Sequence, residues 1–263
     1  MRAQRRLVLL SAVTAAVSAS RVAAADLSEV KARGTLRVIA AADEAPETFS
    51  FDAAANPGFE RELVEGFAKL QGLKVEAVKA KAYGERIPML NRDEGDVIVA
   101  IFDTADRRKL VDFTVEVMPT HNIAVTLDSR PLVKTIDELK ELRVGAVKGA
   151  KPAEEAVEAG VPPRALHLYA TQDEMTQALR KGSLDAVILP VSELVVASRQ
   201  TQGLKAGCTV GPAGKVAWAV RRQDEALRAA LDEYLTNVRR SPSWSRLIVK
   251  YFGDEALRVL GKR

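Results

Sequence analysis

The sequence alternates short apolar runs with longer segments whose apolar residues recur at helical spacing, and this alternation limits the possible folds more than any other feature. Segment 58–70 places Phe59, Leu63 and Phe67 on one helical face, and segment 225–238 shows the same pattern. The strand-like runs lie at 36–41, 75–80, 96–102, 123–127, 143–147, 165–169, 184–189 and 216–220. Strands separated by helices predict an α/β fold with parallel sheets.

Two helix starts are marked by capping boxes, in which a hydroxyl and a carboxylate three residues later satisfy free backbone N–H groups. Thr135 is followed by Glu138, and Thr171 is followed by Glu174. We therefore expect helices that begin directly after Thr135 and Thr171.

The alternating segments form two groups, one at 26–119 and the other at 120–214. Residues 215–263 add one strand-like run and helices, which is too little chain to bury a core of its own. We therefore expect the chain to cross to a second lobe and then return to the first. Ligand pockets favour such interfaces, at the carboxyl ends of parallel strands.

Residues 1–25 have the pattern of a secretory signal peptide. A start with Arg5 and Arg6 precedes an apolar run at 7–17, and an Ala-rich stretch ends at Ala25. The run is shorter than the roughly 20 apolar residues of a membrane anchor, so we expect cleavage near Ala25 and a periplasmic protein. Four of the 39 basic residues lie in this segment, and the other 35 balance 35 acidic residues. Nothing in this balance favours nucleic-acid binding.

The chain contains few of the residues from which catalytic or metal centres are usually built. Cys208 is the only cysteine, and the two histidines, His121 and His167, lie far apart in sequence. Cys208 is expected to be a buried structural residue, and His121 to make a local hydrogen bond. We therefore expect no enzyme activity, no metal and no cofactor.

One stretch is specific enough to suggest a family. Thr104-Ala-Asp-Arg-Arg-Lys-Leu-Val-Asp-Phe113 has the pattern Thr-x-x-Arg followed by Val-Asp-Phe. Weaker motifs in a matching order lie at 34–38, 46–51, 58–63, 86–90, 144–149, 182–187 and 245–253. In these motifs the chain resembles the family-3 periplasmic solute-binding proteins, the polar-amino-acid type of transport receptor.

The resemblance implies a two-lobed α/β fold of periplasmic-binding-protein type II, with crossing segments near 119–122 and 212–216. It implies that a hinge motion encloses a small carboxylate-bearing solute, an amino acid or a related organic acid. The closed receptor, expected to be a monomer, would deliver this solute to the permease of an ABC transporter.

In the family, the arginine of the specific motif holds the carboxylate of the ligand, and here that residue is Arg107. A guanidinium presents a planar fork of donors that matches a carboxylate and stays charged at any working pH. Thr104 would donate its hydroxyl to the same carboxylate, or cap the short turn that follows it. The alternative for Arg107 is a surface ion pair with Asp106 or Asp112.

The resemblance places further ligand-binding residues in both lobes. Gly149 and Ala150 precede a helix start whose free N–H groups attract anions, although an ordinary strand-to-helix turn would look the same. Tyr83 and Phe49 align with aromatic residues of the family's pocket, with core packing as the alternative for both. Asp43, in an acidic loop, would either bind a cationic group or be a solvated surface residue.

Two positions depart from the family pattern. Pro190 occupies the place of the aspartate that takes the ammonium of an amino acid, and a buried ammonium without a carboxylate is costly. Phe102 replaces a smaller residue in a strand that is normally open to polar groups of the ligand. We therefore expect a ligand other than a standard α-amino acid, unless Asp43 or Glu193 supplies the missing acid.

Other functions stay open at this point. A periplasmic accessory or sensory protein, for example one that assists a redox enzyme, would keep the fold and lose the ammonium site. A dehydratase-type enzyme would need a positioned acid or base in the cleft, for which Glu47 or Glu193 can be nominated. Similar lobes also precede the catalytic domain of some murein-cleaving lytic enzymes. Because the chain ends at Arg263, we do not expect it to be such an enzyme.

Overall fold

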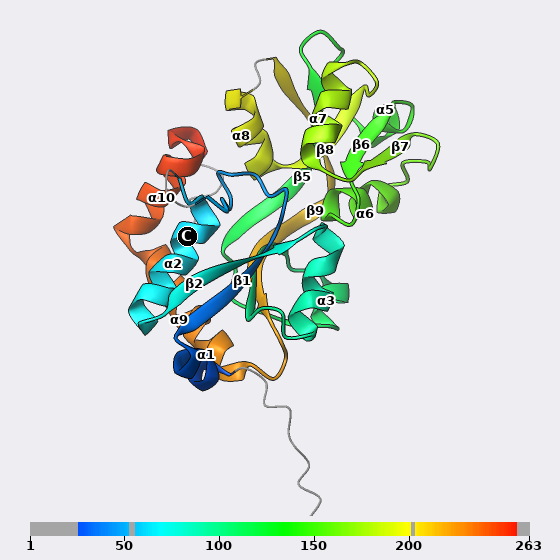
Figure 1. The fold of residues 1–263 in the computed structure, drawn as a ribbon. Coiled ribbons are helices and arrows are strands. Elements are labelled where there is room, and N and C mark those ends of the chain that lie inside the picture. Colours follow the sequence, from blue (N-terminus) through cyan, green and yellow to red (C-terminus); the bar gives the residue numbers. More distant parts are fainter. Residues whose placement is uncertain (1–25, 53–55, 201–202, 257–263) are drawn as a thin grey trace, which may run out of the picture.

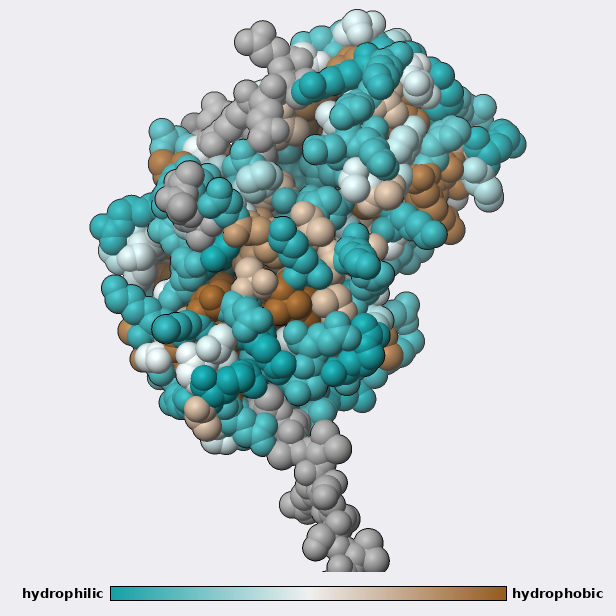
Figure 2. All heavy atoms as spheres, in the orientation of Figure 1, coloured by the Kyte–Doolittle hydropathy of each residue, from teal (hydrophilic) through white to brown (hydrophobic). Residues whose placement is uncertain are grey.

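The computed structural model describes residues 26–52, 56–200 and 203–256, which form two α/β lobes (Figure 1). The predicted signal peptide and its cleavage site near Ala25 lie outside the described residues. We call the elements before β5 and after β9 lobe 1, and the elements between these two strands lobe 2. The face of the molecule seen in Figure 2 is mainly hydrophilic, with small hydrophobic patches.

The strands follow the order β2-β1-β3-β9-β5-β8-β6-β7, and β4 also pairs with β9. In lobe 1, β1 pairs in parallel with β2 and β3, and in lobe 2, β6 pairs in parallel with β7 and β8. The α/β fold with parallel strands is therefore confirmed. The strand bounds are β1 (Thr35–Ala41), β2 (Lys74–Ala80), β3 (Val97–Phe102), β4 (Asp112–Phe113), β5 (Met118–Leu127), β6 (Val144–Val147), β7 (Leu166–Tyr169), β8 (Ala186–Pro190) and β9 (Leu204–Val220).

Helices follow the strands in both lobes, and their starts agree with the capping signals. The Thr135 hydroxyl accepts the N–H of Glu138 at 3.2 Å, and Thr171 does the same for Glu174. The bounds are α1 (Leu27–Arg33), α2 (Phe59–Gln71), η1 (Tyr83–Glu85), α3 (Arg86–Asn91), α4 (Ala105–Arg108), α5 (Ile136–Lys140), α6 (Lys151–Glu158), α7 (Gln172–Arg180), α8 (Val191–Gln200), α9 (Glu225–Arg240), α10 (Pro242–Phe252) and η2 (Asp254–Ala256).

Two strands are longer than the sequence predicts, and they connect the lobes. The apolar runs at 123–127 and 216–220 are only parts of β5 and β9, which pair antiparallel along most of their length. Their polar residues were missed because hydrogen bonding between the strands keeps them extended without the apolar pattern that marks a strand in the sequence. The expected crossing segments 119–122 and 212–216 fall inside this pair, next to a register shift between Thr120 and Asn122.

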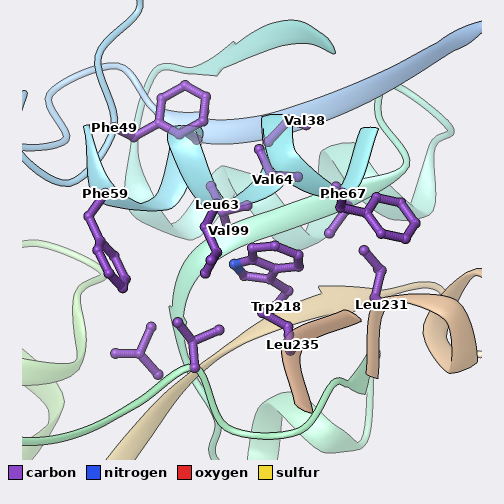
Figure 3. Close-up of a cluster of buried hydrophobic side chains, with 14 of the residues drawn as sticks. Val38, Phe49, Phe59, Leu63, Val64, Phe67, Val99, Trp218, Leu231 and Leu235 are labelled. Carbon is purple, nitrogen blue, oxygen red and sulfur yellow. The ribbon is translucent and has the colours of Figure 1, made fainter. Parts of the chain in front are cut away.

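Separate hydrophobic cores stabilise the two lobes. In lobe 1, Trp218 of β9 is completely buried beneath α2 and α9, between Leu63 and Leu235 (Figure 3). The C-terminal helices α9 and α10 therefore pack on lobe 1, while lobe 2 has its own clusters around β6 and β8. Cys208 is partly buried against the lobe 2 core. The exact lobe boundaries, at 119/120 and 214/215, stay predictions.

A buried carboxylate fixes the start of β3. Asp96 is completely buried and accepts hydrogen bonds from Arg33 and from the side chain and backbone N–H of Arg37. The buried guanidinium of Arg221 lies 3.8 Å from the same carboxylate. Removing one partner leaves the other charge buried without compensation, and this is more costly than losing the pair itself.

We expect Asp96→Ala to lower the free energy of unfolding by about 3–5 kcal/mol, because Arg33 and Arg37 lose the buried carboxylate that accepts their hydrogen bonds. Urea unfolding followed by circular dichroism measures this change. Asp106→Ala is the control, because its exposed carboxylate pairs with Lys109 at the surface, and it should leave the midpoint unchanged. Equal midpoints for the two variants would contradict a stabilising role of Asp96.

Candidate functional site

A cavity lies between the lobes, where the carboxyl ends of β3, β6 and β8 meet. The last residues of these strands, Phe102, Val147 and Pro190, all line it. We call it the interlobe cavity, and its volume is about 40 Å³. The other lining residues are Glu44, Tyr83, Arg86, Ala100 and Arg107 from lobe 1, and Ala150, Lys151, Pro152, Gln172, Ile188, Leu189 and Glu193 from lobe 2.

Arg107 lies at this cavity, in the short helix α4, and its side chain is only 13% exposed. Its guanidinium donates to the carbonyl oxygen of Phe102 at 3.1 Å and to Glu154 of lobe 2 at 3.4 Å. Burial lowers the pKa of Arg107, and Glu154 opposes this effect. The ion-pair partner is therefore an acid of the opposite lobe, and not Asp106 or Asp112, which pair with Lys109 and Arg228.

The lobe 2 wall opposite Arg107 is the start of helix α6. Ala150 is the N-cap residue and makes no side-chain cap, so the first helical N–H is that of Lys151. The Lys151 side chain is 12% exposed, and its ammonium lies 3.4 Å from Glu158, 3.6 Å from Glu154 and 3.8 Å from Glu155. The start of α6 and Lys151 line the same cavity as Arg107, and this positive charge would attract an anion that competes with these glutamates.

A second cavity, also of about 40 Å³, shares Phe102 and Pro190 with the first. Three glutamates line it: Glu44 after β1, Glu60 in α2 and Glu193 in α8. We call it the acidic chamber, and its remaining lining residues are Thr48, Ala100, Met118, Ser192, Val216 and Phe252.

Burial controls the ionisation of these glutamates. It raises the pKa of Glu44 to about 7 and that of Glu193 to about 8, while the charge of Arg86 opposes both shifts and the Glu44 carboxyl group adds to the shift of Glu193. Burial also raises the pKa of Glu60 to about 8, although a hydrogen bond from the Trp218 indole opposes the shift. Because these pKa values are about 7 to 8, a large share of the three carboxyl groups is protonated at neutral pH.

Arg86 is the buried cation nearest to these acids, and a bulge in β3 holds it. The register of β3 against β9 shifts between Ile98 and Ile101, and Ala100 has a φ of 51°, which is unusual for a residue with a side chain. The guanidinium of Arg86 donates to the carbonyl oxygens of Val99 and Ala100 at 3.2 and 3.1 Å. The bulge thus satisfies Arg86 with neutral acceptors instead of carboxylates.

Sequence reasoning placed several residues at the site that the structure places elsewhere. Phe49 is 1% exposed and packs edge-on against Phe51, so it is a core residue and not a pocket residue, because its loop folds back over α2. The Thr104 hydroxyl accepts the N–H of Arg107 at 3.3 Å and caps α4. Gly149 meets the backbone of Gly84 across the lobes. Neither Thr104 nor Gly149 lines the interlobe cavity.

Other predicted residues do reach the cavity or its rim. Tyr83, Phe102, Ala150 and Pro190 line it together with Arg107. Asp43 faces the backbone N–H of Gln172 at the start of α7, which lowers its pKa, while burial, the larger effect, raises it. Neither oxygen of Asp43 reaches full hydrogen-bond geometry with a described residue.

The cavity-lining residues that the sequence did not indicate are charged side chains in helices. Arg86 and Glu60 fit amphipathic helices equally well as surface residues, so their type gave no signal. Glu193 was nominated as a substitute for the missing acid at Pro190 and as a candidate acid or base. In the described ranges no helix has the length and apolar character needed to cross a bilayer, and no cluster of three metal-binding side chains is found.

Comparison with known proteins identifies a family and two kinds of relatives. A model of the bacterial extracellular solute-binding proteins, family 3, matches residues 36–254. A mutant of ArgBP from T. maritima has a TM-score of 0.77 at 24% identity, over 87% of this chain and 99% of that chain. An ancestral arginine-binding protein bound to glutamine has a TM-score of 0.74 at 26% identity, over 84% and 99%.

The curated relatives carry a different name. A membrane-bound lytic murein transglycosylase F from Stutzerimonas stutzeri is 26% identical over 235 residues, which cover 87% of this chain and 48% of the relative. The chain therefore spans about half the length of the curated relatives that it matches. These relatives correct the expectation that the chain has no enzyme role. That expectation rested on the lack of catalytic motifs up to Arg263, and the end of the chain was wrongly taken to exclude a lytic enzyme.

We expect the melting temperature to fall between about pH 5 and about pH 9, because the folded state raises the pKa of Glu193 from 4.5 to about 8. A raised carboxyl pKa contributes stability that is complete below the unfolded value and is lost as the pH rises through the folded value. Glu193→Gln should flatten this decrease and raise the melting temperature at the alkaline end. Differential scanning calorimetry measures both effects.

Glu94→Gln serves as the control, since this exposed glutamate pairs with Arg92 at the surface and lines neither cavity. It should keep the pH dependence of the parent protein. An unchanged slope in Glu193→Gln would show that the Glu193 carboxyl group is not enclosed by the closed lobes.

Proposed function

Because this chain belongs to family 3 of the bacterial extracellular solute-binding proteins, we propose that its two lobes capture a small carboxylate-bearing solute in the interlobe cavity. One observation carries this proposal. Arg107 of lobe 1 and Lys151 of lobe 2 are largely buried cations that line the same cavity from opposite sides. A carboxylate between them would be attracted by both lobes, and would therefore favour their closure.

A carboxylate of the protein itself already pairs with Arg107. Glu154 of α6 lies 3.4 Å from the guanidinium, and its side chain is 45% exposed, so it can rotate into solvent. In the proposed cycle the ligand carboxylate replaces Glu154 and forms the bidentate pair that a guanidinium favours. The Arg107–Glu154 pair supports selectivity for carboxylates, because the Arg107 guanidinium already pairs with a carboxylate that comes from lobe 2.

Closure would take place about the β5–β9 pair, the continuous connection that passes between the lobes. Register shifts near Asn122 and Ile123 interrupt its ladder there, and such irregularities allow strands to bend. Gly149 and Gly84 meet across the lobes, which supports a closed arrangement in this structure. The solute would be an amino acid or a related organic acid, passed by a monomeric periplasmic receptor to an ABC permease.

We expect Arg107→Ala to abolish the thermal stabilisation produced by any carboxylate ligand, because the buried donor fork for the carboxylate is lost. A thermal-shift screen of amino acids and organic acids measures this. A ligand at 100 times its dissociation constant should add about 2.7 kcal/mol to the stability of the parent protein. Arg108→Ala is the matched control, since its exposed guanidinium pairs with Asp103 away from the cavity. A full shift in Arg107→Ala would exclude this site.

A second candidate function is supported by the curated relatives. The chain would be the solute-binding part of a murein-acting protein, and a carboxylate-bearing fragment of the cell wall would close the lobes. Cell-wall peptides carry free carboxylates, so the same cationic wall would serve this ligand. This candidate differs from the first in the partner that reads the closed state, which would be a catalytic unit instead of a permease.

If the second candidate holds, soluble muropeptides should stabilise the protein more strongly than any free amino acid or organic acid. We expect the stabilisation to disappear in Arg107→Ala and to persist in Arg108→Ala. The measurement is the same thermal-shift assay, combined with the release of soluble fragments from purified sacculi. Stabilisation by free amino acids alone, with no response to muropeptides and no release, would favour the transport receptor.

A further inference from the structure

We propose that the acidic chamber binds the ammonium group of a ligand whose carboxylate lies at Arg107, so that the ligand is an amino acid with its ammonium inserted past Phe102. This inference rests on the proposed function, because Arg107 supplies the other end of the site. It concerns Glu44 and Glu193, to which the family comparison assigns no role.

The chamber and the interlobe cavity share part of their lining. Glu44 and Glu193 line the interlobe cavity as well as the chamber, so a ligand bound between the lobes meets both glutamates. The cations Arg107 and Lys151 line only the interlobe cavity. A molecule with a negative group at one end and a positive group at the other matches this distribution.

Glu44 provides an independent indication of a bound group. Its side chain is 4% exposed and lines both cavities, yet its Oε2 atom accepts no hydrogen bond from a described residue. The nearest cation, Arg86, stays 3.9 Å away from this oxygen. A buried carboxylate oxygen without a donor is unfavourable, and a ligand N–H group in the chamber would supply the donor.

The basic groups of the protein do not neutralise the chamber. The guanidinium of Arg86 donates to carbonyl oxygens of β3 and to that of Tyr83. The chamber itself is lined by the carboxyl groups of Glu44, Glu60 and Glu193. Asp43 lies close enough to raise the pKa of both Glu44 and Glu193. Without a ligand the surplus is removed by protonation, and a bound cation would replace these protons.

The walls of the chamber are compatible with an ammonium group. Its volume is about 40 Å³, which is enough for a group of the size of a water molecule. Phe102 and Phe252 are among its lining residues, and aromatic rings attract ammonium ions. A metal ion is not favoured, since the described side chains form no cluster suited to one.

The departure at Pro190 is consistent with this arrangement. Pro190 ends β8 and offers no charge, but Glu193 follows in the first turn of α8 and carries a carboxyl group into the chamber. The position of the ammonium would therefore shift from the end of β8 to the space behind Phe102. A ligand whose ammonium lies several bonds from its carboxylate fits this separation better than an α-amino acid.

The experiment compares three matched sets of probes by isothermal titration calorimetry: ω-amino acids from 3-aminopropanoate to 6-aminohexanoate, the corresponding carboxylates, and the corresponding alkylamines. We expect at least one ω-amino acid to bind about tenfold or more tightly than its matched carboxylate and amine. Glu44→Gln and Glu193→Gln should each remove this advantage and leave carboxylate binding unchanged. Titrations in two buffers of different ionisation enthalpy should show proton release on binding near neutral pH.

Glu94→Gln is the matched control and should bind like the parent protein, because Glu94 pairs with Arg92 at the surface and lines neither cavity. Equal affinity for ω-amino acids and simple carboxylates, unaffected by Glu44→Gln or Glu193→Gln, would overturn the ammonium site and leave the Arg107 carboxylate site in place. A different result would refute the proposed function instead. In that case the parent protein binds no carboxylate but still binds alkylamines, and Glu193→Gln removes the amine binding, so the ammonium site of the chamber stands. The two failures are therefore distinguishable.

Discussion

The antiparallel pairing of β5 and β9 is the constraint on which the rest of the structure depends. These strands run through both lobes, and each lobe adds its parallel strands to one side of the pair. The carboxyl ends of β3, β6 and β8 consequently face the same interlobe space. Each lobe has its own core, so the proposed closure would bend the irregular part of the ladder near Asn122.

The interlobe space holds cations and carboxyl groups whose charges are compensated within the protein. Glu154 lies near both Arg107 and Lys151, and Glu155 and Glu158 also lie near Lys151. The glutamates of the acidic chamber are compensated mainly by protonation, as their raised pKa values indicate. In the proposed function, the ligand carboxylate would replace Glu154 at Arg107, and the ligand ammonium would replace the protons.

The sequence predicted the fold well and the site only in part, for physical reasons that particular residues illustrate. Apolar periodicity and capping residues such as Thr135 are local signals, so helices and parallel strands could be read directly. Polar stretches of β9 stayed hidden, because the strand is held by its partner. Arg107 was found from a motif, whereas Phe49 could have lain in the core or the pocket until the fold of its loop was known. The grouping of Glu44, Glu60 and Glu193 depends on three distant elements, and no spacing rule brings them together.

The relation to the two kinds of relatives becomes clearer when binding and chemistry are separated. Residues 36–254 carry the family's solute-binding lobes, and the curated relatives contain a matching half together with as much additional chain. In the proposed function, the charged groups of the cleft would hold a ligand and close the lobes, since Arg107 and Lys151 lie on opposite sides of it. Such a closure would be a change of shape that a permease or a catalytic unit reads equally well. Ligand chemistry and partner choice would then be independent properties of this fold, and the residues around Phe102 would determine only the first.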